Sequence, residues 1–152
     1  AIYALAKSIV QIPLARYLDL EDGERDDFYV LVGGAALGSL YCFTIPFIRS
    51  PLELYMLQSL GGVADALLMA SYYALFSHHV DKGHDGFEWS LLSVGGLTFS
   101  YAIGGAYGGV VADLYGFKTL FFMSGIVNII GCVATIFLYP YIDRGSKGSV
   151  TK

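Results

Sequence analysis

The stretch GGAYGGVVADLYGFK, residues 104–118, places two pairs of glycines among small and apolar residues. In water, each glycine inside a helix costs about 1 kcal/mol relative to alanine. Gly104, Gly105, Gly108 and Gly109 together would therefore disfavour the helix that the surrounding apolar residues suggest. Helix propensity does not explain this stretch, so its environment must.

That environment is predicted to be lipid. Of the 152 residues, 55% are hydrophobic and 14% are charged, whereas soluble domains carry about 25% charged residues. Apolar runs near the roughly 20 residues that cross a hydrocarbon core cover residues 1–18, 28–48, 54–77, 89–112 and 119–142. They are too long for strands and lack the alternation of a membrane barrel. We expect an all-α membrane protein with five transmembrane helices in residues 1–142 and a polar tail at 143–152.

In lipid the glycines acquire a packing role. Small residues four positions apart let two helix backbones approach closely, which replaces the missing hydrophobic drive for association. Gly104 and Gly108, Gly105 and Gly109, and Gly34 and Gly38 have this spacing. The alternative is that glycine is simply common in membrane helices. Two overlapping pairs on one helix favour close packing.

The distribution of basic residues predicts the orientation. Five spans place the termini on opposite sides, and short loops rich in Lys and Arg stay in the cytoplasm. One side carries Arg16, Arg25, Lys82, Arg144, Lys147 and Lys152, and the other carries Arg49 and Lys118. We therefore expect an integral membrane protein of the plasma (inner) membrane with a cytoplasmic C-terminus.

Three stretches make the chain resemble the major facilitator superfamily of secondary transporters. IPLARYLDLEDGER, residues 12–25, is similar to its loop motif Gly-x-Leu-x-Asp-Arg-x-Gly-Arg, with Ala15 at the first glycine and Asp19 at the aspartate. VDKGHDGFEWSLLSVGG, residues 80–96, is similar to the basic loop before the fifth helix of a domain. GGAYGG, residues 104–109, resembles the Gly-Pro-x-x-Gly-Gly of that helix in antiporters.

The resemblance implies a twelve-helix protein of two six-helix halves that works by alternating access. This chain is similar to helices 8 to 12, so we expect a fragment whose partner is the missing transporter half. Arg16 and Asp19 would belong to the cytoplasmic loop motif.

Two charged residues lie inside predicted spans. Ionisable groups there are costly and usually face a cavity or a partner. Lys7 precedes Asp19 by a dozen residues and Asp65 follows Glu53 by the same interval, so both lie roughly 18 Å along their helices, near the midplane. Desolvation would let Asp65 exchange protons, whereas a nearby Lys7 would keep it ionised. Proton coupling, a permanent ion pair and a purely structural link between two helices all remain open.

Gln11 and Gln58 lie on approximately the same helix faces as Lys7 and Asp65. They extend a polar track or serve as hydrogen-bonding links between helices. With Lys7 and Asp65 they are the candidate substrate or ion pathway.

We thus expect part of a secondary active transporter of a small solute, with proton coupling as an option. The alternative is a small membrane scaffold or accessory subunit that packs against another membrane protein. No Walker-type glycine loop points to ATP, and no enzymatic activity, cofactor, metal or nucleic-acid partner is expected. The residues that would recognise a substrate are expected largely on helices outside this chain.

Overall fold

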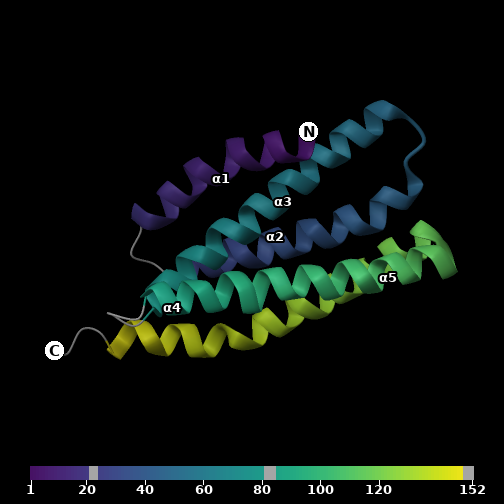
Figure 1. Cartoon of the computed structure of the whole chain (residues 1–152). Coiled ribbons are helices and arrows are strands. Elements are labelled where there is room, and N and C mark those ends of the chain that lie inside the picture. The colour runs from purple at the N-terminus through teal and green to yellow at the C-terminus, as the bar shows by residue number, and fades with distance from the viewer. Residues whose placement is uncertain (21–23, 81–84, 149–152) are drawn as a thin grey trace.

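The backbone forms long helices that run back and forth along one direction (Figure 1). The structure is a computed structural model that describes residues 1–20, 24–80 and 85–148. Within these ranges the helices are α1 (Ile2–Leu20), α2 (Glu24–Thr44), the 3-10 turn η1 (Ile45–Phe47), α3 (Pro51–His78), α4 (Asp85–Ser90), the π-helical segment η2 (Leu91–Thr98) and α5 (Phe99–Gly148). No strand occurs in the described part of the chain.

Helix α3 is the centre of the N-terminal part, because it packs against both α1 and α2. It begins where Pro51 occupies the first turn and the Ser50 hydroxyl accepts a hydrogen bond from the Glu53 amide at 3.3 Å, which satisfies an otherwise free donor. Its buried residues are almost all small, which allows two neighbours to approach its backbone. They are Leu57, Gly61, Gly62, Ala64, Ala66, Ala70, Ser71 and Ala74.

The C-terminal part is a helical hairpin. Residues 99–115 of α5, here called the outgoing arm, continue from α4 and η2, and residues 117–148 form the return arm (Figure 1). The chain reverses at Gly116, whose φ of 82° and ψ of 162° interrupt the helix. Residues with a side chain rarely adopt these backbone angles, so glycine is the residue suited to the turn.

Aromatic side chains join the hairpin to the rest of the bundle. The rings of Phe43 on α2 and Phe122 on the return arm lie 5.9 Å apart, and those of Phe28 and Tyr139 lie 5.1 Å apart. In α4, which leads through η2 into the outgoing arm, the Trp89 ring lies 5.0 Å from the Phe76 ring of α3. Helix α2 therefore packs against the return arm, whereas α4 contacts the end of α3.

The all-α membrane fold is confirmed. Three helices of the described chain are long and apolar enough to cross a membrane, namely Arg25–Phe47, Pro51–His78 and Gly86–Phe137. The third includes the reversal at Gly116, so its two arms run in opposite directions. Helix α1 is not in this set, although it lies along α3. The count of five spans therefore stays a prediction.

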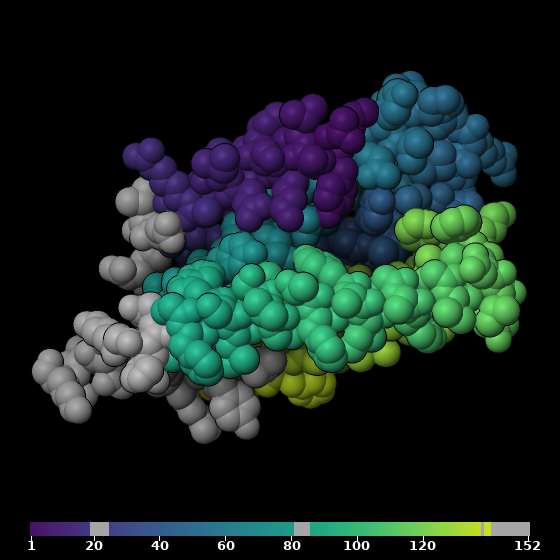
Figure 2. All heavy atoms as spheres, viewed as in Figure 1, coloured from purple at the N-terminus to yellow at the C-terminus, as the bar shows by residue number. Residues whose placement is uncertain are grey.

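Large apolar side chains are exposed over much of the outer surface. In the most apolar 18-residue window of the hairpin only 6% of the residues are buried, compared with 39% in that of α3. Such exposure is incompatible with water over this area and fits lipid or a neighbouring helix. Between α1 and the outgoing arm the surface is hollowed, and α3 forms the floor of the hollow (Figure 2).

Candidate functional site

The structure brings together the two intramembrane charges. The Lys7 Nζ atom of α1 lies 2.6 Å from the Asp65 Oδ2 atom of α3, and their side chains are 29% and 22% exposed. Two opposite charges at this distance attract strongly where little water screens them. Because both side chains are partly exposed, the pair is not sealed inside the described part of the bundle.

Tyr3 completes this group. Its hydroxyl donates a hydrogen bond to the same Asp65 Oδ2 atom at 2.7 Å. We call Tyr3, Lys7 and Asp65 the charge cluster. The carboxylate therefore accepts from two donors on α1, and it retains one of them if the other moves away. Hydrogen bonds to an ionised acceptor are stronger than those between neutral groups.

Sequence reasoning missed Tyr3. The signal was its spacing, because Tyr3 precedes Lys7 by four residues and so lies on the same face of α1. Tyrosine in a membrane helix is usually read as an interfacial anchor, which hid its role as a donor to Asp65.

Further tyrosines surround the charge cluster. Tyr41 on α2 and Tyr101 on the outgoing arm lie close enough to the Tyr3 hydroxyl to interact with it electrostatically. The Gln58 side chain hydrogen-bonds with Tyr41. Gln58 therefore reaches the surroundings of the cluster through Tyr41 rather than by direct contact with Asp65.

Two adjacent glycines of α3 position these groups. A Cβ atom on Gly62 would collide with the Tyr3 carbonyl oxygen and lie 3.1 Å from the Lys7 amide nitrogen. A Cβ atom on Gly61 would lie 2.8 Å from the Tyr41 ring. Close approach of α1 and of the Tyr41 ring to α3 thus requires glycine at both positions. These residues were also missed from the sequence, although their span holds small residues at the same spacing that drew attention to Gly34 and Gly38.

Gln11 lies one helical turn after Lys7 on α1 and lines a separate cavity. This cavity of about 220 Å³ lies between α1, α3 and α4, and it is also lined by Ala15, Tyr73, Ser77 and Trp89 among others. Arg16 is exposed on the last part of α1. The side chain of Asp19 is outside the described residues, so the geometry of the loop motif is not seen.

The predicted packing glycines have different surroundings. A Cβ atom on Gly34 would lie 2.8 Å from the Leu68 amide nitrogen, and one on Gly38 would lie 3.6 Å from the Asn128 side chain. Gly108 faces Leu120 across the hairpin at 3.6 Å. Gly104, Gly105 and Gly109 face open space within the described chain. A further glycine, Gly125 of the return arm, packs tightly under the Phe43 ring.

Comparison with known proteins places this chain in a family. The model of the Major Facilitator Superfamily matches residues 1–152. The chain belongs to the Major Facilitator Superfamily. The match covers the whole chain, which confirms the resemblance carried by the three motifs.

Two curated relatives within this superfamily are distant. An uncharacterized MFS-type transporter of Methanocaldococcus jannaschii is 25% identical over 134 residues, which are 86% of this chain and 33% of the relative. The vesicular acetylcholine transporter of Caenorhabditis elegans is 25% identical over 124 residues, which are 78% of this chain and 23% of the relative. The chain thus spans a third or less of the length of these relatives. No solved structure matches it significantly.

Proposed function

We propose that this chain is part of a secondary transporter that moves a small solute across the membrane by alternating access. Family membership supports transport as the general activity. The observation that carries the proposal further is the charge cluster, in which Lys7, Asp65 and Tyr3 meet between helices α1 and α3. Charged groups kept inside membrane helices usually lie on a substrate or ion pathway.

The surroundings of the cluster support a pathway rather than a sealed joint. Lys7 and Asp65 keep part of their surface exposed, and Tyr101 of the outgoing arm approaches from another helix. A solute or proton that reached the exposed part of the cluster would meet a carboxylate, an ammonium group and tyrosine hydroxyls. Gln58 continues this polar lining through Tyr41, whereas Gln11 belongs to the cavity nearer the other end of α1.

The proposal is tested by removing the negative charge. Asp65→Asn in the full-length transporter should abolish or uncouple solute transport while membrane insertion persists. Asp113→Asn is the matched control, because Asp113 is an exposed aspartate of the outgoing arm. Uptake or efflux measured in vesicles with and without a pH gradient gives the readout. Normal, still pH-dependent transport by Asp65→Asn would refute the role of Asp65 as a proton carrier.

A charge exchange separates the pathway role from a structural pair. The double variant Lys7→Asp and Asp65→Lys places the carboxylate on α1 and the ammonium group on α3. If the ion pair only joins these two helices, the exchanged pair restores the joint. We expect folding to recover relative to either single variant and transport to stay lost, because a proton or solute needs the carboxylate on α3. Recovery of transport would assign the pair to structure alone.

The remaining parts of the transporter are proposed to cover the open glycines of the outgoing arm. Gly104, Gly105 and Gly109 have no neighbour within the described chain, and stretches of this kind allow close approach of another helix. The half of the protein outside this chain is the proposed partner. We propose that Arg16 and Asp19, which belong to the loop motif, lie at the cytoplasmic end of α1, with the C-terminus on the same side and the protein in the plasma membrane.

The same open glycines favour a second candidate, a non-transporting subunit that packs against another membrane protein. The intact mass of the native protein, solubilised from its membrane, distinguishes the two. A mass two to three times that of the 16.4 kDa chain supports the transporter. A mass equal to that of the chain supports the subunit.

A further inference from the structure

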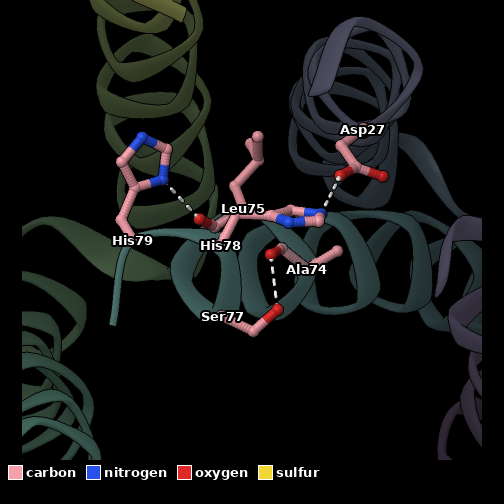
Figure 3. A network of polar contacts seen from close by, with 6 residues as sticks. All are labelled: Asp27, Ala74, Leu75, Ser77, His78 and His79. Atoms are coloured by element: carbon pink, nitrogen blue, oxygen red, sulfur yellow. Dashed lines mark hydrogen bonds and ion pairs between the residues drawn. The ribbon is translucent and has the colours of Figure 1, made fainter. Parts of the chain in front are cut away.

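A second charged contact lies at the end of the bundle where α2 begins and α3 ends. The His78 Nε2 atom lies 3.8 Å from the Asp27 Oδ2 atom (Figure 3). The Asp27 side chain is only 1% exposed, whereas that of His78 is 40% exposed. A carboxylate is therefore buried between helices, and the histidine beside it remains in contact with the surroundings.

The chemistry of this contact depends on the charge of the histidine. A buried carboxylate is stabilised by a nearby cation, and His78 becomes one only when it binds a proton. Histidine changes its charge within the physiological pH range. His78 also occupies the last turn of α3, where the helix dipole favours a positive charge.

We propose that Asp27 and His78 form a proton-binding site that tightens the contact between α2 and α3 when His78 is protonated. When His78 carries a proton, the imidazolium attracts Asp27 and holds the last turn of α3 against α2. When His78 is neutral, this attraction is absent and this end of α3 loosens. The site is separate from the charge cluster, because Asp65 and His78 are thirteen residues apart on α3, roughly 20 Å along the helix.

The neighbouring histidine points elsewhere and provides a control. The His79 Nδ1 atom lies 2.9 Å from the Leu75 carbonyl oxygen, on the side of α3 away from Asp27 (Figure 3). Arg25 and Asp26 are close to Asp27 in sequence, and both Arg25 and Asp27 also take part in other interactions. Ionisable side chains at the same end of the bundle include those of Arg16 and Tyr17 on α1, Tyr29 on α2, Tyr72 and Tyr73 on α3, Glu88 on α4 and Tyr139 on α5.

The test measures local opening of α3 without any transport assay. Hydrogen exchange of the backbone amides of residues 75–79 is followed in the intact transporter in lipid nanodiscs, between about pH 5.5 and pH 8, and corrected for intrinsic exchange. In the wild type we expect protection to fall by about threefold as the pH rises, the size expected of a partly exposed ion pair. His78→Gln should show the low protection at every pH.

Two further variants make the result decisive. His78→Lys supplies a permanent cation and should keep the high protection across the pH range. His79→Gln should behave as the wild type does. The proposal is overturned if wild-type protection does not change with pH, if His78→Gln retains the change, or if His79→Gln abolishes it. Because no solute is involved, the result is independent of the role proposed for Lys7 and Asp65.

Discussion

At the scale of single residues, the Tyr3 hydroxyl is predicted to support the charge cluster. Tyr3→Phe removes the 2.7 Å hydrogen bond to Asp65 and leaves the Lys7 contact in place. A hydrogen bond to a charged group contributes about 1.5–3 kcal/mol, so we expect a loss of transport rate by the full-length protein of at least about tenfold. Tyr107→Phe is the control, since Tyr107 is an exposed tyrosine of the outgoing arm. Equal rates for the two variants would contradict the prediction.

The sequence indicated part of this cluster but not all of it. Lys7 and Asp65 stand out because charges are rare in apolar spans, and counting residues placed them at similar depth. Tyr3 carries no such signal, since an aromatic side chain is unremarkable in a membrane helix. The Asp27–His78 contact was missed because both residues lie at the ends of spans, where charge is expected. Only the packing of α3 against α2 shows that Asp27 is buried.

At the scale of helices, Gly62 is predicted to set the distance between α1 and α3. Gly62→Ala would press a methyl group onto the Tyr3 carbonyl oxygen and bring it 3.0 Å from the Ala6 Cβ atom. Overpacking of this kind costs about 1–3 kcal/mol, so the midpoint of thermal unfolding of the full-length protein should fall. Gly33→Ala makes the same change on α2 with nothing within 4 Å of the new methyl group, and should leave the midpoint unchanged or raise it. A similar fall for both variants would exclude the contact as its cause.

Glycine spacing predicted some helix contacts because close packing in lipid needs small residues at regular intervals. Gly34 packs closely on α3, and Gly38 is in ordinary contact with Asn128. The spacing does not reveal which side of a glycine is occupied. Gly61, Gly62 and Gly125 each pack against a specific backbone or ring from another helix, and such partners become visible only in three dimensions. The same limit applies to Gly105, whose face is open here.

At the scale of the whole molecule, the open face of the outgoing arm is predicted to be a contact surface in the full-length protein. The hairpin is far less buried than α3, and a Cβ atom on Gly105 would meet nothing within 4 Å. A larger side chain at Gly105 therefore fits this chain and obstructs only a helix outside it. We expect Gly105→Ala and Gly105→Leu to reduce transport in order of size, with the leucine variant losing about 1–3 kcal/mol of stability in the assembled protein.

The control for added bulk is Val110→Leu, because Val110 is an exposed residue of the same arm. It should insert and transport as the wild type does. Membrane insertion of Gly105→Leu should also be normal, since replacing a glycine improves helix propensity. A loss of transport with intact insertion would therefore locate the defect in assembly with the remaining helices. If Gly105→Leu transports at the wild-type rate, this face meets lipid, and the partner half must contact the chain through other surfaces.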